Sequence, residues 1–355
     1  MRLEDIYING TGNISIQEPL SKNGIFFPIA YSQPHIRCIE PNYKEYFDPI
    51  VSRRMSKIIK RAIVSAKQAI AESGIKKPDA IITGTGLGCV EDTEKFLDAL
   101  IRNEEKFLQP TYFIQSTHNT ISSQIAINLS CNGYNNTYIH RGVSFENALM
   151  DALLLFKKKE IHSALVTGND EMTPNYFIIL GRIDYWKKEV KNTLEILKQN
   201  NSTGSFAGEG SVSLLFSDKK SEKSYAKLVG FDLFYKPTIS VEEKIKNFLN
   251  ECQLQLSDID VCLTGMNGDK ENDTIYSQVL GSLFSADSIG YYKQLCGQYY
   301  TASSYGLLSA ACCIQKGEMP AHMILSGKTK KEIKHILLYN HFQNKDHSLV
   351  LLSAC

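Results

Sequence analysis

The sequence has 355 residues, of which 43% are hydrophobic and 22% charged, and this composition is typical of a globular protein with a large core. Its formal net charge of +1 provides no general attraction for nucleic acid. No apolar run reaches the roughly 18 residues that a membrane-spanning helix needs. We therefore expect a protein that binds no nucleic acid and has no membrane span.

The nine cysteines are an odd number in a long chain, and the first ten residues lack the charged and then apolar pattern of a secretory signal. These features favour a reducing, cytoplasmic setting. No two cysteines have the CxxC spacing of a zinc site, and Cys312 and Cys313 lie in the apolar run 305–314. The sequence thus predicts buried free thiols, no metal and no cofactor.

Strand-like and helix-like segments alternate along the chain, which is typical of an α/β fold with helices packed on sheets. In the first part, strands are expected at residues 5–10, 79–88, 163–171 and 208–217. The spacing of apolar residues predicts helices at 52–74, at 90–101 and in the later part of 138–160. After the polar stretch 217–227 the pattern begins again, with a strand at 228–234, a helix at 240–253 and a strand and turn at 261–268. This restart predicts two similar halves.

Two glycine-rich turns raise the question of phosphate binding. The turn at 84–88 lacks the GxGxxG spacing, and the helix after it opens with Glu91 and Asp92, which would repel a pyrophosphate. The turn at 208–210 lacks the lysine and hydroxyl of a P-loop. We therefore interpret these glycines as close turn packing, and we expect Glu209 to be a structural carboxylate bonded to backbone amides.

Six segments carry a further signal in their order along the chain. They are residues 53–74, 79–97, 109–129, 163–174, 208–217 and 291–320. In this order they resemble the β-ketoacyl synthases, and the agreement extends over residues 5–353. The resemblance implies an α/β protein of the thiolase-like fold, in which two pseudo-duplicated βαβαβαββ halves form a five-layered αβαβα sandwich. It divides one compact unit into an N-terminal half at residues 1–220 and a C-terminal half at 221–355.

The residues that perform the chemistry of this family are replaced in this chain. The family's cysteine nucleophile stands at a strand-to-helix turn, where this sequence has Arg141, and its two histidines fall on Asn267 and Gln298. The lysine that precedes the second histidine is retained as Lys293. Amide side chains donate hydrogen bonds but do not shuttle protons near pH 7. The resemblance therefore implies a ketosynthase scaffold without its Cys-His-His set.

Two further positions depart from the family pattern. The glutamate expected nine residues after the second histidine is Leu307. The gating phenylalanine is kept as Phe342, but the glycines that follow it are Gln343 and Asn344. Five coordinated losses on an intact scaffold indicate that the active site has been dismantled.

A ketosynthase of this kind resembles a chain-length factor, a non-condensing subunit that pairs with an active β-ketoacyl-ACP synthase and shapes its acyl tunnel. The resemblance implies a heterodimer, an acyl carrier protein bound directly or through the partner, and no condensing activity by the chain alone. The phrase at 140–142 is most similar to subunits of aryl-polyene and flexirubin-type pathways, among the wider polyketide and fatty-acid-type systems. The family's dimer contact matches 116–124, where the candidates to line the tunnel or interface are His118, Asn119, Thr120 and Ile121. For His118, a satisfied core or interface position is the alternative.

Arg141 needs compensation, because its charge opposes the dipole of the helix that follows it. We expect it to fill the former pocket as half of a buried ion pair. His140 has no nucleophile beside it and is not expected to act as a base. The carboxylates that could pair with Arg141, which the sequence does not rank, are Glu146, Asp170, Glu171 and Glu209.

Two other functions remain open. The chain could be an active β-ketoacyl-ACP synthase or acyltransferase that uses another nucleophile, such as Ser144 or Cys296. It could also be a stand-alone acyl-binding or regulatory protein of the thiolase fold, which predicts a homodimer that needs no partner.

Overall fold

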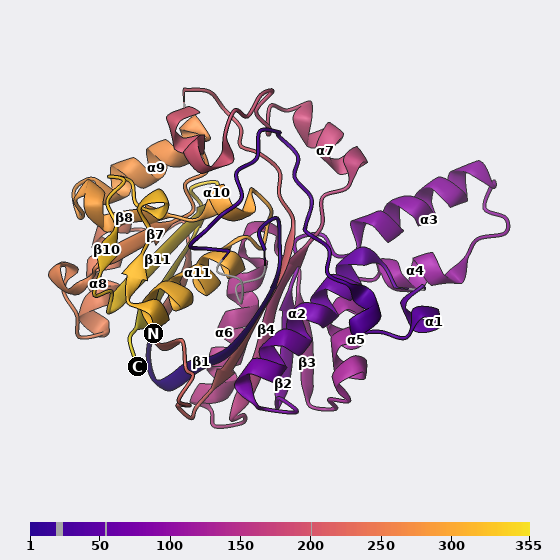
Figure 1. The fold of residues 1–355 in the computed structure, drawn as a ribbon, viewed down its shortest axis with the longest axis horizontal. Helices are drawn as coiled ribbons and strands as arrows, with labels where there is room; N and C mark the ends of the chain where they lie inside the picture. The colour runs from indigo at the N-terminus through magenta and orange to yellow at the C-terminus, as the bar shows by residue number, and fades with distance from the viewer. Residues whose placement is uncertain (19–23, 54, 200) are drawn as a thin grey trace.

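The computed structural model describes residues 1–18, 24–53, 55–199 and 201–355 (Figure 1). Its strands are β1 (Arg2–Ile14), β2 (Ala80–Gly84), β3 (Tyr134–Tyr138), β4 (Ser163–Asp170), β5 (Gly210–Ser217), β6 (Ala226–Tyr235), β7 (Val261–Thr264), β8 (Ile289–Tyr291), β9 (Glu318–Met319), β10 (Lys330–Lys331), β11 (His335–Phe342) and β12 (Asp346–Ser353). Its α-helices are α1 (Pro49–Ser52), α2 (Lys57–Ser73), α3 (Val90–Arg102), α4 (Pro110–Ser116), α5 (Thr120–Leu129), α6 (Ser144–Lys157), α7 (Pro174–Gly181), α8 (Val241–Glu251), α9 (Lys270–Leu280), α10 (Lys293–Cys296) and α11 (Ser303–Lys316). Short 3-10 helices lie at Tyr43–Glu45, Arg141–Val143, Thr193–Gln199, Leu256–Asp258, Ala286–Ser288 and Ala321–Met323. Within these described ranges, no helix combines the length and the apolar character needed to cross a bilayer.

The first long helix starts later than the expected residue 52. The extended backbone of Ser56 separates the short α1 from α2, which begins at Lys57, and serine is a preferred residue at a helix start. The helix ends as predicted at Gly74, whose φ of 73° gives the left-handed cap that glycine adopts without strain. Residue 54, which falls inside the expected helix, lies outside the described residues.

The described strands repeat one topology twice. Ten of them form a mixed sheet in the order β3-β2-β4-β5-β1-β6-β12-β11-β7-β8. The first half has the order β3-β2-β4-β5-β1, and the second half reproduces it as β8-β7-β11-β12-β6. In each half the strand next to the junction strand runs antiparallel to its neighbours, and β1 pairs with β6 to join the halves. The boundary proposed between residues 220 and 221 falls in the connection from β5 to β6.

Three apolar clusters separate the helices and strands into five layers. The largest surrounds α6 and α11, which lie between the strands of the two halves. A second cluster packs α2 and α5 on the outer face of the first half, and a third packs α8 and α9 on the outer face of the second half. The strands alternate accordingly, since Ile81 faces the outer cluster while Ala80 and Ile82 face the central one. The predicted αβαβα sandwich is confirmed.

The glycine-rich turns serve close packing, as predicted. A Cβ on Gly84 would lie 2.6 Å from the carbonyl oxygen of Ser144 at the start of α6, and one on Gly208 would lie 1.9 Å from that of Cys296. Glu209 is buried and accepts hydrogen bonds from the backbone N–H groups of Cys38 at 2.9 Å and Met172 at 3.1 Å. The interpretation of Glu209 as a structural carboxylate is confirmed.

The described cysteines are all free, and eight of the nine are buried. Cys355 is the exposed one. The prediction of buried free thiols is therefore confirmed for every cysteine but the last.

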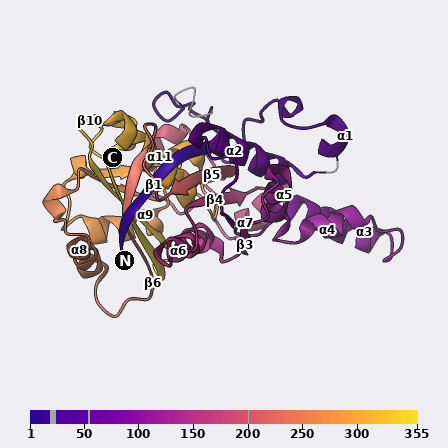
Figure 2. The same cartoon turned by 90° about the horizontal axis from the view of Figure 1, so that it is seen from below.

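One part of the chain extends away from the layered body. Both views show α3 and α4 as an arm beyond the edge strand β3 and helix α5 (Figures 1 and 2). The side chains of Ile101 and Phe107, at and just beyond the end of α3, are 75% and 93% exposed. Such exposed apolar side chains on a projecting element are characteristic of interaction surfaces.

Candidate functional site

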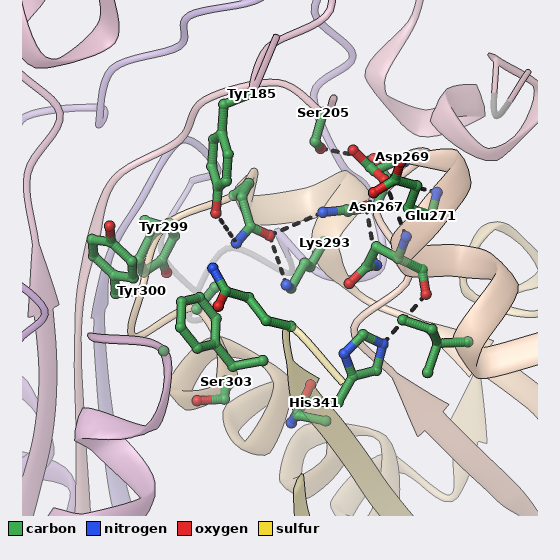
Figure 3. Close-up of a pocket in the computed structure, with 18 of the residues that line it drawn as sticks. Tyr185, Ser205, Asn267, Asp269, Glu271, Lys293, Tyr299, Tyr300, Ser303 and His341 are labelled. Carbon is green, nitrogen blue, oxygen red and sulfur yellow. Dashed lines mark hydrogen bonds between the residues drawn. The ribbon is translucent and has the colours of Figure 1, made fainter. Parts of the chain in front are cut away.

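Loops that follow the carboxyl ends of strands enclose a cavity of about 660 Å³. The strands are β3 and β4 of the first half and β7, β8 and β11 of the second. Such strand ends are the usual place for ligand sites in α/β proteins. The lining includes Gln298 and Phe342 together with Gly142, the neighbour of Arg141. Asn267 and Lys293 also line the cavity (Figure 3). The structure thus brings positions that are distant in the sequence to one site.

Arg141 occupies the turn between β3 and α6 with a left-handed φ of 46°. Its side chain is exposed, and it forms no ion pair within the described part of the chain. The expectation that Arg141 fills the former pocket as a buried ion pair is therefore wrong, because water solvates the guanidinium group instead. Gly142 fills the inward position, and a Cβ there would lie 2.3 Å from the Phe342 ring.

The four carboxylates proposed as partners for Arg141 have other roles. Asp170 and Glu171 accept hydrogen bonds from backbone amides, and Glu209 forms an ion pair with Arg61 at 2.8 Å. Glu146 alone among the four lines the cavity.

The two amides at the family's histidine positions contact each other. The Nδ2 of Asn267 donates a hydrogen bond to Oε1 of Gln298 at 3.1 Å, and the ammonium of Lys293 donates to the same oxygen at 2.6 Å (Figure 3). The Nε2 of Gln298 makes a long contact of 3.5 Å with the hydroxyl of Tyr185. Neither amide exchanges protons near pH 7, so the network holds groups in place without acid–base chemistry.

Burial shifts the pKa values of two charged groups that line the cavity, Lys293 and Glu146. Desolvation lowers the pKa of Lys293 to about 8, against the attraction of nearby acidic groups. Desolvation likewise raises the pKa of Glu146, which is 2% exposed, to about 7, although the nearby hydroxyls of Ser303 and Ser348 and the charge of Lys293 favour its ionised form. Both shifts have the direction expected when a charge is removed from water.

Replacement of Glu146 by glutamine should remove a pH dependence of stability. The folded-state pKa of about 7 lies above the ordinary 4.5, so the folded chain keeps a proton that the unfolded chain has released. The free energy of unfolding of the native protein therefore falls as pH rises from about 4.5 to 7, and the variant lacks this contribution. Denaturant titrations at about pH 4.5, 6 and 8 measure the difference. An unchanged pH profile would contradict the assignment, and the exposed Glu160→Gln change is the control.

The Phe342 loop turns through two residues that carry side chains, Gln343 and Asn344, where the family has glycines. Phe342 packs on Gly142 and lies edge-on to Tyr300 with ring centroids 6.1 Å apart. Gln343 and Asn344 have φ values of 55° and 53°, a left-handed conformation that costs side-chain-bearing residues about 1–2 kcal/mol each. The gating role of Phe342 stays a prediction.

The segment proposed for the tunnel or interface divides by exposure. His118 and Asn119 are exposed, whereas Ile121 is fully buried in the core between α2 and α5. The buried Thr120 hydroxyl donates a hydrogen bond to the carbonyl of Ile114 at 2.9 Å. His118 also packs on Gly88. Direct contact with a partner is therefore open to His118 and Asn119, while the other two support the segment from within.

The alternative nucleophiles lack activation. The Ser144 hydroxyl accepts a hydrogen bond from the backbone N–H of His140 at 2.7 Å and donates one to the carbonyl of Arg141 at 2.8 Å, which fixes the turn. The Cys296 thiol is fully buried, and desolvation raises its pKa to about 12, so the thiolate is scarce near neutral pH. Leu307, at the family's glutamate position, lies in the central apolar cluster between the strands of the two halves.

Several lining residues were not anticipated from the sequence. They include Tyr185, Tyr299, Tyr300, Asn340 and His341. Burial lowers the pKa of His341 to about 3, so this imidazole stays neutral. Asn340 and His341 directly precede Phe342 at the end of β11, a position that could have identified them. Among the described residues, no three His, Cys, Asp or Glu side chains form a group that could hold a metal ion.

The fold is similar to that of solved ketosynthases, and part of the sequence matches a ketosynthase family profile. Residues 35–186 match the family profile described as "Beta-ketoacyl synthase, N-terminal domain". A search of the curated proteins gave no match.

Solved structures share the fold over the whole chain. One is "The ishigamide ketosynthase/chain length factor", with a TM-score of 0.84, 15% identity and 100% of both chains covered. A β-ketoacyl synthase from Burkholderia phymatum gives a TM-score of 0.82 at 12% identity, with 99% of this chain and 100% of that chain covered. The ketosynthase ApeO in complex with its chain length factor ApeC, from Xenorhabdus doucetiae, gives 0.77 at 15% identity, with 99% and 98% covered. The predicted resemblance to this family and the thiolase-like fold are confirmed.

Proposed function

We propose that this chain is a non-condensing, chain-length-factor-like subunit that pairs with an active β-ketoacyl-ACP synthase and shapes its acyl tunnel. The observation that supports it is the composition of the cavity. Among the described residues that line it there is no cysteine, the one histidine stays neutral, and amides occupy the positions where the family's chemistry requires proton transfer. Condensation needs a nucleophile and imidazole groups acting together. The chain therefore contributes shape and binding to the reaction of its partner.

The first edge of the sheet supports pairing with another subunit. β3 is the terminal strand on that side, and its side chains are exposed or half-buried. Near this edge, Ile114, Ile127 and Ile139 are 62%, 67% and 46% exposed. Unpaired strand edges and exposed apolar side chains are usually covered by a partner. Similar solved structures that contain a ketosynthase and a chain length factor favour an active ketosynthase as that partner.

The pathway assignment is part of the same proposal. One similar structure is described as a type II polyketide acyl-carrier protein in complex with its ketosynthase, with a TM-score of 0.74 and 13% identity. By this likeness we assign the chain to polyketide, aryl-polyene or fatty-acid-type assembly in the cytoplasm, with an acyl carrier protein docking on the complex.

Intact mass spectrometry tests the loss of chemistry. The purified chain is incubated with an acyl-carrier-protein thioester, and we expect no acyl adduct on it. The active ketosynthase, incubated in parallel, should carry one on its cysteine. An adduct on this chain alone would support an active acyltransferase instead.

Replacement of Ile114 by lysine is expected to weaken the heterodimer at least tenfold while leaving the fold intact. The side chain is exposed in the free chain, so its charge is tolerated there but would be desolvated at an apolar interface. Size-exclusion chromatography after co-expression with an active ketosynthase of the same genome measures the complex. Leu325→Lys, at an exposed position in the other half, is the control. A stable homodimer that forms no complex with the co-expressed ketosynthase would favour the stand-alone acyl-binding function.

A further inference from the structure

Several buried polar atoms of residues that line the cavity have no hydrogen-bond partner in the protein. The part of the cavity that these residues form is called the cavity floor. Within the described residues, these atoms are Oε2 of Glu146, Nδ2 of Asn340 and the hydroxyl of Ser303. All three side chains line the cavity and are at least nine-tenths buried, at 2%, 8% and 6% exposed. Buried polar groups normally have hydrogen-bond partners, because leaving one unpaired is costly. The floor is therefore shaped to hold a polar occupant rather than an apolar chain.

Existing hydrogen bonds leave one free donor and one free acceptor on the cavity floor. The Tyr292 hydroxyl donates to Oδ1 of Asn340 at 2.7 Å, so the amide of Asn340 presents its Nδ2 as the free donor. On α6, Oε1 of Glu146 accepts a bond of 3.4 Å from Ser348, and Oε2 is left as the free acceptor. An occupant that satisfies both groups needs one acceptor and one donor of its own.

The charges around the cavity argue against an anion. Asp184, Asp269 and Glu271 line it together with Glu146, whereas Lys293 is the one cationic lining residue among the residues that the structure describes. The ammonium of Lys293 is already bonded to Gln298. A carboxylate entering this cavity would lose water and meet an excess of negative charge. A neutral ligand avoids both costs.

We propose that the cavity is a binding site for a small neutral ligand with a carboxamide-type group, whose N–H donates to Glu146 and whose carbonyl accepts from Asn340. This site is separate from the proposed tunnel-shaping role, because it lies inside this chain and requires no partner. It also differs from an acyl-chain pocket in the chemistry of its floor.

Propionamide and propionate test the proposal, because they match in shape and differ in charge. Both are titrated into the full-length chain at about pH 8 and followed by NMR. We expect propionamide to bind in the millimolar range and propionate to bind at least about tenfold more weakly. Glu146→Leu should weaken propionamide binding about tenfold or more, as loss of a hydrogen bond to a charged group does. Glu160→Gln, at an exposed position, should leave it unchanged.

Each remaining outcome decides against the site. Propionate binding as tightly as propionamide would overturn the neutral preference. Binding that survives Glu146→Leu would place the ligand elsewhere. No binding of either compound up to about 50 mM would mean that the cavity holds only water. Heterodimer formation is unaffected by all of these results, so failure of this site and failure of the proposed function are distinguishable.

Discussion

Replacing Arg61 by methionine is expected to lower the free energy of unfolding by about 3–5 kcal/mol. Arg61 lies on α2 with 3% of its side chain exposed, and its Nη2 is 2.8 Å from Oε1 of Glu209, whose side chain is 4% exposed. The substitution leaves the Glu209 carboxylate buried without its cation. Since Glu209 also holds the backbone amides of Cys38 and Met172, its disturbance should spread to both segments.

Denaturant titration of three variants isolates this effect. Arg102→Met breaks a surface pair with Asp98 whose side chains are 76% and 56% exposed, and it should cost at most about 1 kcal/mol. The double variant Arg61→Met with Glu209→Gln removes both charges of this pair and should recover part of the loss, although Glu40, which is 2.5 Å from the same Nη2 and 36% exposed, still loses its cation. If Arg61→Met were no more harmful than Arg102→Met, the buried pair would not be important for stability.

The same pair connects the core to the cavity. Gly208, next to Glu209, packs on the backbone of Cys296 and Gly297, and its N–H donates to the carbonyl of Gln298 at 3.3 Å. A loosened Glu209 therefore also loosens the segment that carries Gln298. We infer that the ion pair stabilises the cavity as well as the fold.

The fold could be predicted because its signals are local and repeated. The spacing of apolar residues identified the core of α2, and Gly74 marked its end. The restart of the pattern after residue 217 corresponds to the second copy of the strand order. The start of α2 was placed too early, because the break at Ser56 depends on one backbone conformation rather than on an apolar pattern.

The site was predictable in position but not in chemistry. Asn267, Lys293 and Gln298 converge as the resemblance to the ketosynthases implied, because each follows the end of a parallel strand. The exposure of the Arg141 side chain was not predictable from the sequence. It depends on the contact between Gly142 and Phe342, which occupy the place where we expected Arg141. Glu146 was considered only as a partner for Arg141. Oε2 of Glu146 is unpaired in the cavity because elements of both halves pack around it, and a local sequence pattern does not predict such packing.

Arg141→Cys is expected to restore acylation without restoring condensation. The position lies at a strand-to-helix turn before α6, where a helix N-terminus lowers the pKa of a thiol. A cysteine there should form an adduct with an acyl thioester, detectable by intact mass. Ser144→Cys is the matched control, because its side chain points into the turn and is buried, so we expect no adduct.

Condensation should remain absent in Arg141→Cys, because Asn267 and Gln298 supply no imidazole. General acid–base groups contribute about 10²–10⁴-fold to such reactions, so adding Asn267→His and Gln298→His should raise product formation by about that factor. The assay uses a complex whose partner has its own nucleophile replaced by alanine, so that any product comes from this chain. Measurable condensation by Arg141→Cys, at a rate equal to that of the triple variant, would show that the amides already perform the histidines' role, and the chain would then be one substitution away from a working ketosynthase.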